Sequence, residues 1–180
     1  LMADGEGGAE VYSIATKADQ SRIIFSEAVH MVKQSPVLSK FIKKRQTDMY
    51  MPITFSKMAP LASESKSLDG LNSHCVIIDE LHAIRDRNLY DVMKQSMSAR
   101  RQPMLVMITT AGTVRECIFD DIYDHATKVI DGVIQDEQFL PVLYELDSRA
   151  EWTDYRMWQK ANPGLGTIKK IEYLAEKVER

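Results

Sequence analysis

The sequence predicts an α/β protein with a mostly parallel sheet and helices on both of its faces. Segments rich in β-branched residues alternate along the chain with segments whose apolar residues recur at helical spacing, which is typical of this class. Two strand-like segments, 74–80 and 103–112, are nearly continuous apolar runs. Such runs are expected of strands that are covered on both faces in a parallel sheet.

The first elements follow from their residue patterns. Residues 10–16 (EVYSIAT) predict a strand, and the segment from Thr16 to Asp19 has the Thr-x-x-acid signature of a helix start. An apolar face continues this helix to about Gln34. Ser35-Pro36 then ends it and can cap a short second helix that runs through about Lys43.

The middle of the chain continues the alternation. Prolines in 48–62 favour a small hairpin or an excursion at the edge of the sheet. After the apolar run at 74–80, residues 88–100 predict a helix with one apolar face. Thr113 to Glu116 form a capping box for the helix that follows the second apolar run, and Asp131-Gly132 ends that helix.

The last part of the chain changes character. Residues 139–146 (FLPVLYEL) predict a final strand, which Pro141 places at an edge of the sheet. Two helices broken at 162–164 are expected beyond it. We therefore expect a core domain over 1–150 and a helical subdomain or linker over 151–180.

Composition narrows the class of protein. The chain has 180 residues, of which 44% are hydrophobic and 27% charged, and no apolar run reaches the roughly 18 residues that a membrane span needs. A net charge of −3 argues against a protein that grips a long nucleic acid over its whole surface, although a local basic patch is compatible with it. The most basic run, 43–46, is expected to be a solvated helix end. Cys75 and Cys117 lack metal-ligand spacing and are expected to be buried, reduced thiols.

Polar residues stand where the two apolar runs end. Asp79 and Glu80 end the first run, and Thr109, Thr110 and Gly112 end the second. Ligands of α/β proteins bind at the carboxyl ends of the parallel strands. If the two strands are neighbours, the acids and the threonines therefore face one site.

Two adjacent acids at a strand end suit phosphate chemistry. Asp79 can supply the single rigid oxygen ligand that Mg²⁺ needs when substrate phosphates provide others. Glu80 can then orient a water for attack on a terminal phosphoryl group. The alternative is that both acids are simply solvated at the end of a strand.

The motifs together resemble a known family. VIIDE at 76–80 has the form of a Walker B motif followed by a catalytic glutamate, as in P-loop ATPases. The wider set resembles the large terminase subunit of tailed bacteriophages, the DNA-packaging motor, from about Gly5 to Arg180. The segments that carry this resemblance are EVYSIATKADQSRIIFSEA, SLDGLN, VIIDELHA, RRQPMLVMITTAGT and WQKANPGLG.

The resemblance implies a fold and roles for named residues. The fold would be a RecA-like P-loop NTPase of the catalytic-glutamate class. Asp79 would bind Mg²⁺ and Glu80 would activate the hydrolytic water, with ATP as substrate. Thr109, Thr110 and Gly112 would belong to the family's coupling motif, which senses the γ-phosphate. Contacts of hydroxyl groups and of a glycine turn can change as that phosphate leaves.

The chain departs from the family pattern in three places. No G-x-x-x-x-G-K-[ST] motif occurs, so we expect the P-loop and the first strand to lie upstream of residue 1, and this chain alone to bind ATP weakly or not at all. No acidic cluster of an RNase H-like nuclease follows the ATPase region, so we expect no DNA cleavage by this chain. Asp69 stands where many packaging ATPases carry an arginine, which leaves Lys66, Arg100 and Arg101 as basic candidates, each also explained as a solvated charge.

His82 opens an alternative function. DELH at 79–82 also spells the motif of DExH helicases, in which this histidine links the ATP site to a neighbouring domain; a local hydrogen bond in a first helical turn explains it equally well. The alternatives to a packaging ATPase are therefore a helicase-like NTPase fragment and a non-enzymatic module that docks on the portal or the small subunit.

The resemblance also implies partners and a location. The partners would be double-stranded DNA, the portal protein, the small terminase subunit and further copies of the chain in a motor ring, with no membrane partner. The location would be the host cytoplasm and, transiently, the procapsid portal.

Overall fold

The structure is a computed structural model that describes residues 1–62, 68, 70–84, 87–112 and 117–178. The chain forms two compact units, Leu1–Asp124 and His125–Arg180. The sequence predicts a different boundary, at residue 150, between an ATPase core domain and a helical subdomain or linker. That boundary concerns the extent of the ATPase domain and stays a prediction.

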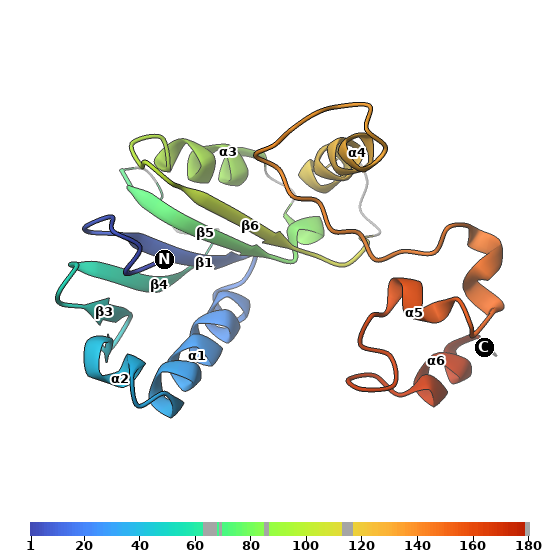
Figure 1. The fold of residues 1–180 in the computed structure, drawn as a ribbon, viewed down its shortest axis with the longest axis horizontal. Helices are drawn as coiled ribbons and strands as arrows, with labels where there is room; N and C mark the ends of the chain where they lie inside the picture. Colours follow the sequence, from blue (N-terminus) through green and yellow to red (C-terminus); the bar gives the residue numbers. More distant parts are fainter. Residues whose placement is uncertain (63–67, 69, 85–86, 113–116, 179–180) are drawn as a thin grey trace. The chain divides into compact units, whose positions relative to one another are not determined.

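A six-stranded sheet organises the first unit (Figure 1). Its spatial order is β2-β3-β4-β1-β5-β6, and the four strands from β4 to β6 are parallel, whereas β2, β3 and β4 pair antiparallel. The predicted α/β class with a mostly parallel sheet is therefore confirmed. The bounds are β1 Glu10–Ala15, β2 Lys43–Lys44, β3 Met49–Met51, β4 Ser56–Ala62, β5 Ser73–Asp79 and β6 Met104–Ile108.

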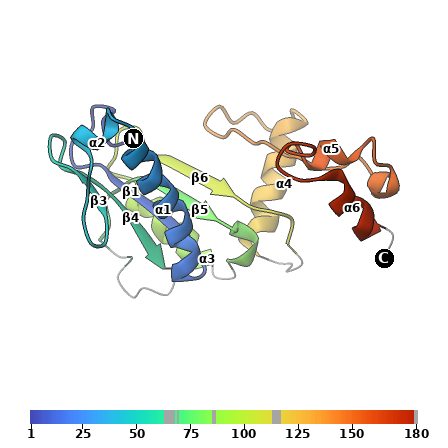
Figure 2. The same ribbon diagram turned by 90° about the horizontal axis from the view of Figure 1, so that it is seen from below.

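Helices cover both faces of this sheet (Figures 1 and 2). Helix α1 (Ala18–Gln34) packs Phe25 and Val29 on one face, and α3 (Arg87–Ser96) covers the other face together with the start of α4. Side chains of β1 and β5 alternate between the two clusters, because successive residues of a strand point to opposite faces. Burial on both faces fixes the backbone of these two strands up to their carboxyl ends. Val11 and Cys75 belong to the α1 face, and Tyr12, Ile14, Val76 and Ile78 to the α3 face.

The N-terminal helices start and stop differently from the prediction. The N-cap of α1 is Lys17, without a side-chain cap, so the predicted cap at Thr16 is wrong. The N-cap of the short helix α2 (Leu38–Phe41) is Val37, which makes no side-chain cap, and the Ser35 hydroxyl accepts from the Leu38 N–H at 3.2 Å. Helix α2 ends before Lys43 because Lys43–Lys44 pair as β2 with β3. The basic run at 43–46 is therefore a hairpin strand and turn, and its interpretation as a helix end is wrong.

The predicted hairpin at 48–62 is confirmed by the pairing of β3 with β4. Strand β4 also pairs with β1 along its whole length, so it lies inside the sheet. Pro60 is tolerated there because β3 pairs only with Ser56–Met58, which leaves the β3 side of Pro60 without a ladder partner.

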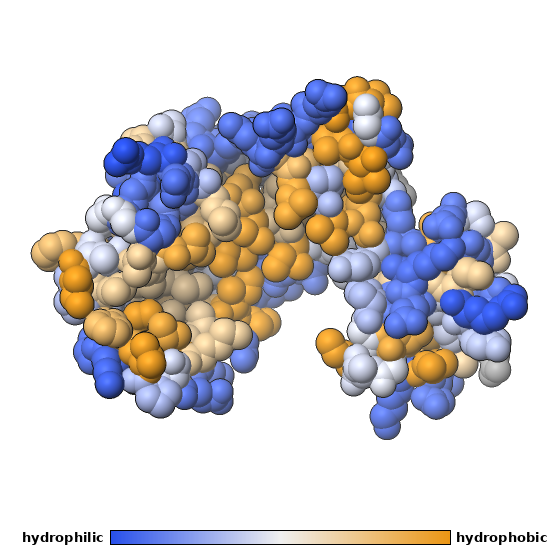
Figure 3. Space-filling model, in the orientation of Figure 1, coloured by the Kyte–Doolittle hydropathy of each residue, from blue (hydrophilic) through white to orange (hydrophobic). Residues whose placement is uncertain are grey.

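Strand β6 is the last strand of the sheet in the part of the chain that the structure describes. The prediction of a strand covered on both faces is wrong for it, since Met104 and Ile108 are 48% and 53% exposed. Figure 3 shows hydrophobic residues gathered on the surface over this part of the sheet. The helix after β5 is also shorter than predicted, because α3 ends at Ser96.

The second unit contains little regular structure. Helix α4 (Ile118–Ile130) begins in the first unit and ends just before Asp131-Gly132, as the sequence predicts; the φ of +71° at Gly132 suits glycine. The predicted capping box at 113–116 lies outside the described residues. After α4 come a 3-10 turn (Arg149–Thr153), α5 (Trp158–Ala161) and α6 (Ile171–Val178).

The predicted strand at 139–146 is wrong. The segment has no strand pairing, and three of its alternate side chains, Leu140, Val142 and Tyr144, are 88%, 61% and 60% exposed. A strand needs a neighbour for its backbone hydrogen bonds, and none of the described strands pairs with this segment.

Candidate functional site

The carboxyl ends of β5 and β6 lie side by side. The two strands are parallel neighbours with Asp79 opposite Ile108, so Glu80 follows at the level of Thr109. The two strands are therefore neighbours, which is what a site shared by the acids and the threonines requires. Asp79, Glu80, Thr109 and Gly112 gather at one edge of the sheet because two paired parallel strands end there together.

Glu80 has an unusual backbone conformation. Its φ of 55° and ψ of 51° place it in the left-handed region, which costs a residue with a Cβ on the order of 1–2 kcal/mol. A 3-10 turn (Leu81–Ala83) holds it, with Leu81 almost fully buried and the Ala83 N–H donating to the Glu80 carbonyl at 2.8 Å. The Glu80 N–H itself donates to Asp79 Oδ1 at 3.0 Å. No residue pattern in the sequence predicts this strain, which is frequent at functional sites.

His82 joins the two strand ends. Its backbone N–H donates to Thr109 Oγ1 at 3.1 Å, and its ring Nδ1 lies 2.9 Å from the same oxygen. Nδ1 also lies 3.1 Å from Glu80 Oε2, a solvent-shielded oxygen that has no aligned hydrogen-bond donor. His82 therefore contacts both the proposed water-activating acid and the proposed coupling segment.

Gly112 approaches His82 more closely than any other residue type could. A Cβ built on Gly112 would lie 2.7 Å from His82 Cβ, a separation that real Cβ atoms essentially never show. The backbone at Gly112 needs no left-handed φ, so the glycine is required here by space. Thr110 is exposed, and its carbonyl accepts from Thr109 Oγ1 at 2.9 Å.

Two of the three basic candidates, Arg100 and Arg101, lie away from this site. Arg100 lies before β6, at the amino ends of the parallel strands, where its guanidinium donates hydrogen bonds to three backbone carbonyls. Its Nη2 donates to Gly8 O and to Asn72 O, each at 2.7 Å, and its Nη1 donates to Gly7 O at 3.2 Å. Arg101 lies at the same end and donates its backbone N–H to Glu6 Oε1. Lys66 lies outside the described residues.

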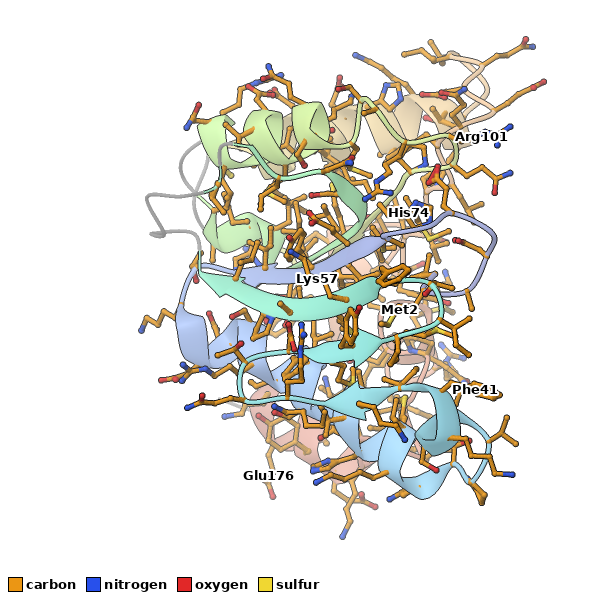
Figure 4. All side chains as sticks on the ribbon, turned by 90° about the vertical axis from the view of Figure 1, so that its left-hand side faces the viewer. Met2, Phe41, Lys57, His74, Arg101 and Glu176 are labelled. Carbon is orange, nitrogen blue, oxygen red and sulfur yellow. The ribbon has the colours of Figure 1, made fainter. Side chains whose placement is uncertain are left out.

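The amino ends of the strands hold a second histidine that sequence reasoning missed. His74, on β5, is fully buried, with Nε2 2.6 Å from Asp4 Oδ2 and Nδ1 2.8 Å from Glu6 Oε2. The hydrogen bond with His74 lowers the pKa of Asp4 below its ordinary value. Figure 4 shows His74 and Arg101 toward the same end of the strands. Nothing in the sequence pairs residues this far apart.

A magnesium ion would find a sparse ligand set at the carboxyl edge. The described residues contain no group of three or more His, Cys, Asp or Glu side chains placed to hold a metal. One carboxylate supplemented by substrate phosphates is nevertheless a usual way of binding Mg²⁺, and Asp79 fits that arrangement. Two cavities, of about 460 and 450 Å³, lie elsewhere, and neither is lined by Asp79 or Glu80. No described helix is both long and apolar enough to cross a membrane.

Comparisons with known proteins agree with this architecture. The chain is 33% identical over 112 residues to the protein YmfN of Escherichia coli K12, a match that covers 62% of this chain and 25% of YmfN. It is 25% identical over 176 residues to the large terminase subunit of Enterobacteria phage HK97, covering 95% of this chain and 34% of that protein. The chain therefore spans about a third or less of the length of these relatives.

The fold and a family model lead to the same group. The crystal structure of the HK97 bacteriophage large terminase superposes with a TM-score of 0.83 at 24% identity, over 98% of this chain and 37% of that one, which shows a shared fold. The family model described as "Terminase large subunit, ATPase domain" matches residues 1–128. Because this match covers most of the chain, the protein belongs to the family of terminase large subunit ATPase domains.

Proposed function

We propose that this chain supplies the metal-binding and water-activating half of an ATPase site in a large terminase subunit. One observation carries the proposal: the paired ends of β5 and β6 bring Asp79 and Glu80 beside Thr109 and Gly112. Family membership implies ATP hydrolysis, and this edge of the sheet is where an α/β fold binds its ligand.

Each residue has a role that its position supports. Asp79 ends a rigid, doubly covered strand and would hold Mg²⁺, which when bound polarises the phosphate oxygens and offsets their charge. Glu80 presents its carboxylate at the same edge and orients the attacking water. The segment Thr109–Gly112 contacts this region through His82, so a shift of either side is transmitted to the other.

The proposed role in DNA packaging rests on membership of the terminase family. ATP hydrolysis would drive translocation of double-stranded DNA into a procapsid, with the portal protein, the small terminase subunit and further copies of the chain in a ring as partners. Such a motor acts in the host cytoplasm and transiently at the procapsid portal. Endonuclease activity would belong to other parts of a large subunit.

The 180 residues alone are proposed to have little or no ATPase activity. A triphosphate site needs backbone N–H groups and a lysine to cradle the phosphates, and the sequence contains no such motif.

Two alternatives make different predictions. A helicase-like NTPase would also use the Asp79–His82 motif, but it would unwind duplexes rather than fill procapsids. A docking module without catalysis would bind the portal or the small subunit, and substitution of Glu80 would leave its binding unchanged.

The test is ATP turnover by a full-length large subunit that carries these residues. Glu80→Gln keeps the size of the side chain and removes its charge, so turnover should fall on the order of 100- to 10,000-fold, the range of a lost general base. The matched control, Glu6→Gln, changes a glutamate at the amino end and should retain turnover. Full turnover in Glu80→Gln would overturn the proposal.

A further inference from the structure

We infer that His82 is a positioning residue whose Nδ1 N–H passes between Thr109 and Glu80. In the conformation seen here the N–H is held by Thr109, which leaves the Glu80 carboxylate free to orient a water. When Thr109 moves away, the N–H turns to Glu80 Oε2 and holds the carboxylate back. The inference rests on the proposed role of Glu80.

The hydrogen-bond partners of Thr109 fix which atom donates. The Thr109 hydroxyl proton is committed to the Thr110 carbonyl at 2.9 Å, and its oxygen already accepts from the His82 backbone N–H. At the 2.9 Å contact with Nδ1 the hydroxyl oxygen must therefore accept again, so Nδ1 carries the proton. The neighbouring carboxylate of Glu80, which only accepts when ionised, favours the same tautomer.

Glu80 Oε2 is the waiting second acceptor. It is 3.1 Å from Nδ1 and shielded from solvent, yet it has no aligned donor. A shielded carboxylate oxygen without a donor is costly, so the carboxylate gains a bond as soon as the N–H becomes free. The proximity of both acceptors to one N–H means that a small rotation of the imidazole is sufficient for the exchange.

Gly112 provides the second link between His82 and the segment that would sense the phosphate. The space for a Cβ at Gly112 is filled by His82 Cβ at 2.7 Å. The segment Thr109–Gly112 therefore grips His82 at two points, a hydrogen bond and a packing contact. A displacement of Thr109–Gly112 therefore moves the His82 imidazole as well.

The first test observes His82 directly in the 180-residue chain. Two-bond ¹H–¹⁵N NMR spectra distinguish the two neutral tautomers of an imidazole. We expect the proton on Nδ1, and in Thr109→Val we expect it to stay on Nδ1 with a shifted, more downfield resonance, because Glu80 then accepts it. Thr109→Ser, which keeps the hydroxyl, should resemble the unchanged chain. A proton on Nε2, or an Nδ1 resonance that Thr109→Val does not move, would overturn the inference.

The second test measures turnover in a full-length large subunit that carries these residues. Asparagine places its amide N–H near the Nδ1 position and glutamine near Nε2, so the two variants separate the position of the donor from its presence. His82→Gln removes the N–H that holds the Glu80 carboxylate back, so kcat should rise by about tenfold to a hundredfold with little change in the KM for ATP, as expected for the loss of one restraining hydrogen bond to a charged group. His82→Asn, which keeps a donor near Nδ1, should return kcat most of the way to the unchanged value.

The outcomes separate this inference from the proposed function. Equal kcat values in His82→Asn and His82→Gln would overturn the positioning role. If Glu80→Gln loses turnover in the same assay, the proposed function stands whatever the histidine variants do. If Glu80→Gln keeps turnover, the proposed function fails, and this inference fails with it.

Discussion

The two ends of the parallel sheet each place a histidine among carboxylates, but they are built differently. At the amino end, His74 is fully buried between Asp4 and Glu6, and Arg100 binds the carbonyls of the neighbouring loops. At the carboxyl end, the side chain of His82 is 24% exposed and Glu80 has a left-handed backbone. Among the described residues, a shielded carboxylate oxygen without an aligned donor occurs at both ends, in Glu6 and in Glu80.

The difference indicates which end is structural and which is functional. Multiple hydrogen bonds to the Arg100 guanidinium fix the loops before β1, β5 and β6, which stabilises one arrangement. A residue with a strained backbone is maintained only where the surrounding structure enforces it, and such residues concentrate at sites of chemistry. The predictions below compare matched residues at the two ends.

The largest difference is expected between two aspartates. Asp79→Asn should raise the Mg²⁺ concentration for half-maximal ATP turnover at least about tenfold, the loss seen even for residues behind the metal ligands. Asp4→Asn should leave that concentration unchanged, because Asp4 lies at the other end. Turnover measured against Mg²⁺ concentration in a full-length large subunit checks both. A change of equal size in the two variants would remove the distinction between the ends.

Arginine substitutions should act on stability rather than on turnover. Arg100→Ala removes every hydrogen bond that the guanidinium makes to Gly7, Gly8 and Asn72, so the free energy of unfolding should fall by about 1–3 kcal/mol. Arg101→Ala keeps the backbone N–H that donates to Glu6 and should stay within about 0.5 kcal/mol. Urea unfolding of the 180-residue chain measures both. If Arg100→Ala lowers the free energy of unfolding no more than Arg101→Ala does, the hydrogen bonds of the Arg100 guanidinium contribute little to stability.

Glycine at position 80 should stabilise the chain while it removes the carboxylate. The left-handed backbone of Glu80 costs less without a Cβ, so Glu80→Gly should raise the free energy of unfolding by about 0.5–1 kcal/mol, a gain reduced by the larger entropy of glycine in the unfolded chain. Glu6→Gly, without a positive φ to relieve and with a carboxylate that accepts from Arg101, should lower stability. If Glu80→Gly is destabilising, the strain at position 80 is not present in solution.

The smallest effect is expected from pH. The pKa of Asp4 is lower in the folded chain than its ordinary value of 3.8, because His74 binds the carboxylate. As pH falls, the unfolded chain therefore takes up this proton first, so the stabilisation is present above about pH 4 and is lost as pH falls through the folded-state pKa. Unfolding free energy measured from pH 5 to 3 should fall less steeply in Asp4→Asn than in the unchanged chain. If the unfolding free energies of Asp4→Asn and of the unchanged chain fall equally steeply with pH, the ionisation of Asp4 does not contribute to stability.

Local patterns predicted the main elements and the meeting of the two strand ends. Strands β1 and β5 and helix α1 follow from apolar periodicity, and the carboxyl-edge site follows from where two apolar runs stop. The strand predicted at 139–146 is wrong because alternating apolar residues and β-branched residues indicate only a preference for extended backbone, whereas a strand also needs a partner strand. The left-handed Glu80, the His74 cluster and the carbonyl contacts of Arg100 depend on residues that the fold brings together from distant parts of the chain.

A structure of a full-length large subunit that carries these residues, bound to Mg²⁺ and a non-hydrolysable ATP analogue, tests the proposed site most directly. We expect the γ-phosphate to lie at the carboxyl edge of β5 and β6, with Asp79 contacting the metal directly or through one water. Glu80 should lie within hydrogen-bond reach of a water in line with that phosphate. A triphosphate bound at the amino end, near Arg100 and His74, would contradict the proposed site.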